Sequence, residues 1–207
     1  GRAGIIVEGD AAATVANITA QATRFRIGFV ADLVTALLFL LTAWALYALL
    51  RRVNQPLALL FLLLNLAGVA MQCFSMILLY AALPLSSGGG YLDAFTAEQL
   101  NALAMLFLGL YKAGFTGAQL FYGAWTLPLG YLVFRSGFLP KVLGVLLMLD
   151  CLAVLVWFAQ FFFLPGYPAV SYVPWAISFV AEVALSLWLI VVGVKETESK
   201  VIAVELA

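Results

Sequence analysis

The sequence has no histidine and only two cysteines among its 207 residues. Histidine is the commonest general base and the usual ligand for haem, zinc and copper, so we expect no such cofactor, no metal centre and no serine–histidine pair. Cys73 and Cys151 fall near the middle of apolar stretches, where a thiol behaves as a small hydrophobe. We predict that both cysteines pack and that they form no disulfide.

Catalytic motifs are missing as well. The chain has no glycine-rich loop leading into Lys-Ser or Lys-Thr, no His-Glu-x-x-His motif and no Gly-x-Ser-x-Gly turn. We therefore predict no catalytic residues and a protein that is not an enzyme.

Charged residues are scarce, at 10% of the chain, and the ten basic side chains balance the ten acidic ones. A chain without net charge has no basic field that attracts nucleic acid, which we exclude as a partner. The acidic residues are also too scattered to indicate an oxygen-ligated metal site.

Apolar residues, by contrast, make up 66% of the chain and gather in five long stretches. A bilayer core of roughly 30 Å needs about 20 helical residues, and continuous apolar runs without period-two alternation favour helices over barrel strands. We predict an all-α polytopic transmembrane helix bundle in the lipid bilayer. It forms a single domain over residues 1–207, with spans at about 27–50, 57–82, 113–134, 141–164 and 172–194.

Two further helices are predicted outside the spans. Asp10 is a capping residue for an interfacial helix over about 10–24, although this segment is also compatible with the first turns of a long helix that continues to Leu50. Thr96 and Gln99 form a capping box at the start of a helix. A single helix from there to Phe134 would be near 57 Å long, so we expect a break within 109–117 and a separate outer-side helix at about 97–110.

Basic residues predict the orientation. If each stretch crosses the bilayer once, six of them lie on one side, which the positive-inside rule assigns to the cytoplasm, together with the C-terminus. The six are Arg51, Arg52, Arg135, Lys141, Lys195 and Lys200, and the exceptions are Arg2, Arg24, Arg26 and Lys112.

Ionisable side chains within the spans are the candidate functional residues, because each costs about 2.5–3.5 kcal/mol in lipid unless it is paired, protonated or facing water. They are Asp32, Asp150 and Glu182, with Lys112 placed to meet one of them. One interpretation is a proton- or ion-coupled site or a polar ligand pocket; the other, which we favour, is hydrogen bonding between helices. The packing interpretation applies more strongly to the polar residues Asn65, Gln72, Gln119 and Gln160.

A stripe of small residues, Gly109, Ala113 and Gly117, recurs at four-residue spacing. Such a stripe lets another backbone approach closely in a membrane. Packing within the chain is the favoured interpretation, and contact with a partner subunit is the alternative.

Three parts of the sequence resemble a family of bacterial membrane proteins known as domain of unknown function 4386. They are Gly9–Thr14 with Phe25–Asp32, the run Leu127–Pro140, and Ala181 and Glu182 with Leu187–Ile190 and Gly193–Lys195. Members usually have one more span before the first of these parts, which implies six spans in all and sequence preceding Gly1. Asp32 and Glu182 match acidic positions of the family, whereas Asp150 stands where members more often have an apolar residue. The resemblance implies no activity, substrate or cofactor.

These observations lead to two hypotheses. The first is a non-catalytic integral protein of the bacterial inner membrane, free-standing or packed as an accessory subunit against a larger membrane complex. The alternative is a small proton-coupled carrier, or a protein that binds lipids or small molecules, with Asp32 and Glu182 as its protonatable groups.

Overall fold

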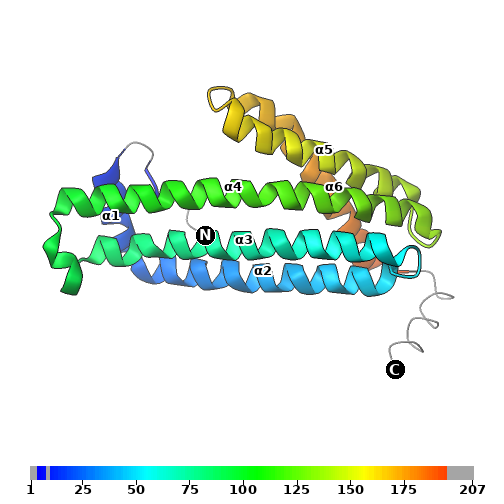
Figure 1. The fold of residues 1–207 in the computed structure, drawn as a ribbon, viewed down its shortest axis with the longest axis horizontal. Helices are drawn as coiled ribbons and strands as arrows, with labels where there is room; N and C mark the ends of the chain where they lie inside the picture. Colours follow the sequence, from blue (N-terminus) through cyan, green and yellow to red (C-terminus); the bar gives the residue numbers. More distant parts are fainter. Residues whose placement is uncertain (1–3, 8–9, 195–207) are drawn as a thin grey trace. The chain divides into compact units, whose positions relative to one another are not determined.

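The computed structural model describes residues 4–7 and 10–194, and the ordered elements in these ranges are all helices (Figure 1). The prediction of an all-α fold is confirmed. The elements are α1 Ala11–Ala20, α2 Ala22–Leu50, α3 Gln55–Ser87, η1 Gly90–Ala94, α4 Ala97–Ser136, α5 Lys141–Phe163, η2 Pro168–Ser171 and α6 Tyr172–Val191.

Four helical segments of the described chain are long and apolar enough to cross a membrane. They correspond to four of the five predicted spans and are α2, α3, α5 and the segment Pro168–Val191, which joins η2 to α6. The remaining predicted span, 113–134, is helical throughout but does not reach the same hydropathy. Its mean hydropathy is lowered by several glycines and by Gln119 and Pro128. The predicted count of five spans stays a prediction.

The expected break in α4 is wrong. The helix runs without interruption from Ala97 to Ser136, so no separate helix ends near residue 110. Glycine costs a helix only about 1 kcal/mol relative to alanine, and tertiary packing offsets a penalty of this size. Gly114 shows such packing, because a β-carbon there would overlap the Ser75 side chain of α3. At about 60 Å, the 40-residue helix is longer than the bilayer core is thick.

The N-terminal helix α1 is distinct from α2. Asp10 caps it as predicted, since its Oδ1 accepts a hydrogen bond of 2.8 Å from the Ala13 amide. Gln21, with φ −115° and ψ 30°, interrupts the helical conformation and separates α1 from α2. Thr19 then donates a 3.0 Å hydrogen bond to the carbonyl of Ser86, near the end of α3. The structure thus has two helices here, separated at Gln21, in place of one unbroken helix to Leu50.

The chain divides into two compact units, and each long helix from α2 to α4 contributes to both. The first unit comprises Gly1–Phe39 and Val69–Thr116 and the second Leu40–Gly68 and Gly117–Ala207. The prediction of one domain stays a prediction. The first unit has a continuous core of buried side chains that includes Ile5, Ile18, Phe25, Leu79, Leu83, Leu92 and Leu108.

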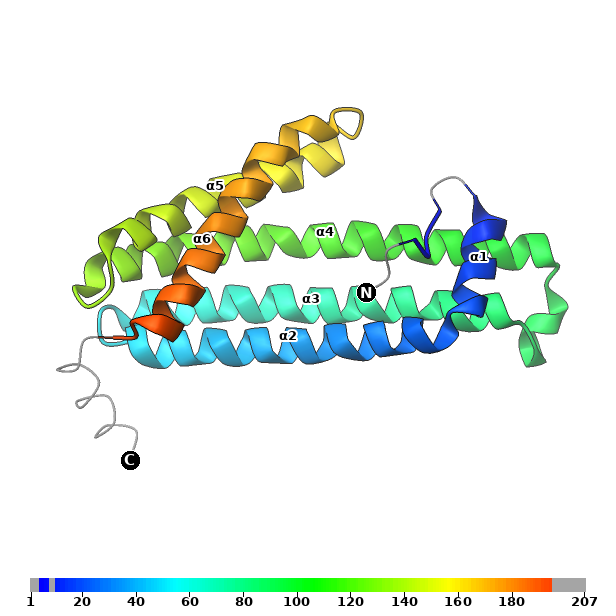
Figure 2. The same ribbon diagram turned by 180° about the vertical axis from the view of Figure 1, so that it is seen from behind.

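In the second unit, α4 and α5 form an antiparallel hairpin with very close backbones. The turn between them contains Gly137 at φ +74°, a conformation that favours glycine. Gly130 and Gly144, each seven residues from Gly137, face one another, since a β-carbon on Gly144 would lie 2.6 Å from the Gly130 carbonyl oxygen. α6 then packs against α5 (Figure 2).

The capping box at the start of α4 is confirmed and gives a first testable prediction. Gln99 Oε1 accepts a 2.9 Å hydrogen bond from the Thr96 amide, and Thr96 Oγ1 accepts one of 3.3 Å from the Gln99 amide. We expect Thr96→Ala to lower the free energy of unfolding by about 1 kcal/mol, because an amide of the first turn loses its acceptor. Thermal unfolding in detergent measures this, with Thr96→Ser as the control that keeps the hydroxyl. Equal melting of Thr96→Ala and wild type would contradict it.

Candidate functional site

Asp150 lies in the interior of the second unit without a hydrogen bond. It is nine residues beyond the start of α5, its side chain is 0% exposed, and neither carboxyl oxygen has a hydrogen-bond partner within residues 4–7 and 10–194. A buried carboxyl without hydrogen bonds destabilises a protein, and buried polar groups are nearly always satisfied in folded structures. Asp150 is therefore a buried ionisable group whose desolvation is not offset by any hydrogen bond from the described residues.

Glu182 meets Asp150 from the neighbouring helix. It lies at the centre of α6, ten residues after its first residue and nine before its last. Its carboxyl is close enough to that of Asp150 to interact electrostatically, yet the side chain is exposed at the surface of the chain. Ser178, one turn earlier, places its hydroxyl within range of Asp150, although the geometry does not make a proper hydrogen bond. Ala181 and Leu185 are buried and hold this face of α6 in place.

Asn65 of α3 belongs to the same layer of the second unit. It is 0% exposed, and neither its amide nitrogen nor its oxygen has a hydrogen-bond partner in the described part of the chain. Neighbouring contacts show where Asn65 lies along the helices. The ring centroids of Phe61 and Trp125 are 6.1 Å apart, so this part of α3 packs against the part of α4 around Trp125. A β-carbon on Gly123 of α4 would in turn lie 3.5 Å from the carbonyl oxygen of Cys151, beside Asp150.

The layer combines two carboxyls, an amide and a hydroxyl in an apolar surrounding. Among the described residues, no three His, Cys, Asp or Glu side chains come together to hold a metal ion. Two carboxylates side by side repel each other at low dielectric constant, so this arrangement favours the arrival of a positive charge. A proton, or a cationic side chain from outside the chain, supplies that charge.

The other ionisable candidates belong to the first unit. Asp32 is half-buried on α2 and Lys112 is exposed on α4, and each makes a polar or electrostatic contact of its own. Gln72 of α3 is half-buried, also has a contact, and lies in the same unit. The structure thus brings together Asp150 and Glu182 and places Asn65 at their level. Among the described residues, Asn65 has no hydrogen-bond partner, so its predicted role in hydrogen bonding between helices stays a prediction.

The close contacts between helices involve other glycines than the predicted ones. Gly109 is exposed, and a β-carbon there would meet nothing within 4 Å, so it makes no close helix contact in the described chain. Ala113 is half-buried and Gly117 is buried. Among the described glycines, the closest approaches to backbone atoms of another helix are instead at Gly130 and Gly144. The sequence offers a signal for this pair, since both glycines are seven residues from Gly137 in the predicted turn. Contact of the Gly109 stripe with a partner subunit stays a prediction.

Both cysteines are free, as predicted, and Cys151 is buried directly beside Asp150. Ser178 is the residue that sequence analysis missed. Its position four residues before Glu182 places the two on one face of α6, and this spacing was the available signal.

The fold and its polar layer define a polytopic, all-helical integral membrane protein. The model of the family described as Domain of unknown function (DUF4386) matches residues 2–193, and the chain belongs to that family. The resemblance of the three sequence parts is thereby confirmed. No curated protein and no solved structure has significant similarity to the chain.

Proposed function

We propose that this chain is a non-catalytic accessory subunit of the bacterial inner membrane, packed against a larger membrane complex through α6, with its C-terminus in the cytoplasm. One observation carries the proposal: the exposed carboxyl of Glu182 lies at the centre of a membrane-spanning helix, beside a second carboxyl that has no hydrogen bond.

The energetics of lipid exposure support an interface at this position. An ionised side chain at the centre of a span costs about 2.5–3.5 kcal/mol, and lipid tails offer no group that reduces the penalty. The segment containing α6 is also the least covered of the four candidate spans. An arginine or lysine in the middle of a partner's span would remove the penalty of Glu182, and Asp150 behind it strengthens the attraction.

The surface around Glu182 has the spacing of a helix-packing seam. Trp175, Phe179, Glu182 and Ser186 are all exposed and follow one another at intervals of four, three and four residues. This alternation is that of the positions along which two helices pack with a left-handed crossing. The rings of Trp175 and Phe179 are stacked with centroids 6.2 Å apart and form one broad apolar end of the seam. We call these four residues the α6 seam.

Charge at the helix ends supports the proposed orientation. Arg51 and Arg52 follow α2, Arg135 is in the last turn of α4, and Lys141 begins α5. All four belong to one end of the second unit, and the positive-inside rule assigns that end to the cytoplasm. Lys195 and Lys200 of the same prediction lie outside the described residues.

The test is co-purification from native membranes with the lipid environment retained. We expect the tagged chain, extracted in polymer-bounded nanodiscs, to carry a stoichiometric membrane protein with a basic residue inside a span. Glu182→Gln should reduce its recovery about ten-fold or more, because coupling between close charges across an interface exceeds about 1.5 kcal/mol.

The matched control is Glu98→Gln, the same change at an exposed residue in the first turn of α4. Its recovery of partner should equal that of wild type. A monodisperse wild-type chain without any partner would contradict the proposal, as would a Glu182→Gln variant that retains its partner fully.

The proximity of Asp150 and Glu182 also favours a second candidate, a small proton-coupled carrier or a protein that binds lipids or small molecules at these carboxyls. In that case, the purified chain alone in liposomes should move protons with its substrate, and Glu182→Gln should abolish the movement. The accessory role predicts no such movement, so an internal pH-sensitive dye distinguishes the two.

A further inference from the structure

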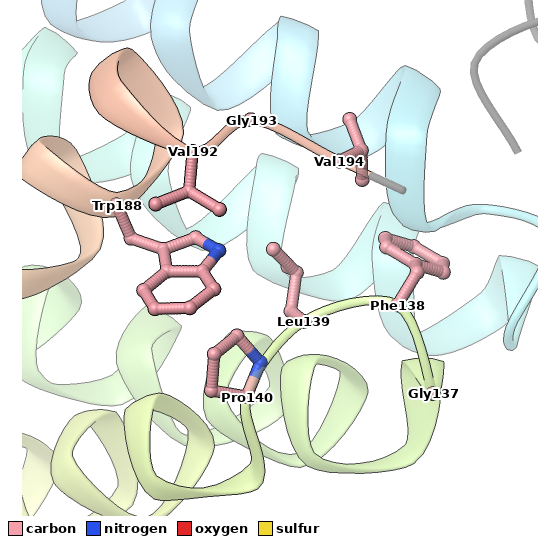
Figure 3. Close-up of a pocket in the computed structure, with 8 residues that line it drawn as sticks. All are labelled: Gly137, Phe138, Leu139, Pro140, Trp188, Val192, Gly193 and Val194. Carbon is pink, nitrogen blue, oxygen red and sulfur yellow. The ribbon is translucent and has the colours of Figure 1, made fainter. Parts of the chain in front are cut away.

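A pocket of about 380 Å³ lies at the end of the second unit that carries the α4–α5 turn. The turn, residues 137–140, forms one wall, and the end of α6 with the residues just after it, up to Val194, forms the other (Figure 3). Phe138, Leu139 and Val192 make the walls largely apolar, so the pocket suits a hydrocarbon chain.

Trp188 adds an unused hydrogen-bond donor to this pocket. Its indole lies over Pro140 and beside Val192, and its Nε1 is buried without a hydrogen-bond partner among the described residues (Figure 3). Tryptophan at a membrane boundary normally donates this hydrogen while its ring stays in the apolar phase. Trp188 is three residues before the last residue of α6, within one turn of the helix end, where an interfacial tryptophan is expected.

The charged side chains that the structure describes at this end are all basic. Arg135 and Lys141 bracket the turn and are both exposed, and the ammonium group of Lys141 is held 5.6 Å from the centre of the Phe134 ring. Arg51 and Arg52 belong to the same end. The acidic residues in the described part of this unit, Asp150 and Glu182, lie at the centre of the spans. Among the described residues, a phosphate group at this end therefore meets only basic side chains.

We infer that this pocket binds an anionic glycerophospholipid of the cytoplasmic leaflet. An acyl chain lies against the apolar walls, an ester carbonyl accepts the hydrogen of Trp188, and the headgroup phosphate lies between Arg135 and Lys141. The inference is independent of the α6 seam, which lies on another part of α6, and the purified chain is sufficient to test it.

Native mass spectrometry of the delipidated full chain, after incubation with dioleoylphosphatidylglycerol or dioleoylphosphatidylcholine, measures the binding. We expect wild type to retain the anionic lipid at least about ten-fold more than the zwitterionic one, since each cation contributes about five-fold at an anionic surface. The double variant Arg135→Gln/Lys141→Gln should lose this preference and keep its weak retention of phosphatidylcholine. Trp188→Phe, which keeps a ring but removes the donor, should retain both lipids about five-fold less.

The control is Arg26→Gln, which removes a cation near the opposite end of α2. It should bind both lipids as wild type does. Equal retention of the two lipids by wild type would overturn the inference. So would an unchanged lipid preference in the double variant, whose substitutions are at exposed positions that do not affect the core.

Discussion

Gly144→Val is expected to destabilise the protein strongly. A β-carbon at Gly144 would lie 2.6 Å from both the carbonyl oxygen of Gly130 and the amide nitrogen of Phe134. These are backbone atoms, which cannot rotate away, so α4 and α5 must move apart. We expect a loss of about 3 kcal/mol or more, or about 5–10 °C in the melting temperature measured in detergent.

Gly109→Val is the matched control, because it introduces the same side chain at another glycine of a long helix. A β-carbon at Gly109 meets nothing within 4 Å, so the variant should stay within about 0.5 kcal/mol of wild type. If both variants melt alike, the close approach of α4 and α5 is not what stabilises the hairpin.

Asp150→Asn is expected to have the opposite effect and to raise the free energy of unfolding of the isolated chain. The change preserves the volume of the side chain and removes a carboxyl that is buried, lacks hydrogen bonds and lies beside Glu182. We expect a gain of about 1–3 kcal/mol, because a buried ionisable group without partners is penalised more than a neutral amide. Thermal unfolding of the purified chain without partner proteins measures it.

Leu147→Ala provides the comparison on the same helix. Leu147 is 2% exposed and lies one turn before Asp150, and its truncation should lower stability by about 2–5 kcal/mol. Melting of Asp150→Asn below wild type would show that the carboxyl is satisfied in the native protein and that the polar layer is structural.

The spans and caps of this fold could be predicted from the sequence because each depends on local chemistry. Apolar runs of sufficient length identify α2, α3, α5 and α6, and their bounds differ from those predicted by a few residues. Asp10, Thr96 and Gln99 act within three residues of the groups they cap. Such short-range features need no knowledge of neighbouring helices.

The continuity of α4 could not be predicted, because it depends on what surrounds the helix. Gly109, Gly114 and Gly117 weaken the helix locally, and the length of the segment exceeds a bilayer crossing, so both arguments favoured a break. Packing at Gly114 against Ser75 offsets the local weakness. The helix then extends beyond the length that the apolar core requires.

Only part of the candidate site could be predicted from the sequence, because the rest also depends on how the helices pack. Asp150 and Glu182 are conspicuous in the sequence as acids within apolar runs, but their proximity depends on the crossing of α5 and α6. Which of them faces outward also depends on that packing, and the sequence alone suggested buried carboxyls for both. The seam around Glu182 becomes visible only once the exposed side of α6 is known.

Photo-crosslinking along α6 in native membranes tests the central claim most directly. We expect a benzoylphenylalanine placed at Phe179 or Ser186, both on the α6 seam, to form an adduct with one membrane protein. The same probe at Val180, which is exposed on a different side of the helix, should yield none. The Glu182→Gln change should remove the adducts from both seam positions. Adducts with lipid alone at Phe179 and Ser186, or equal protein adducts at Val180, would contradict the assignment of this seam as the partner interface.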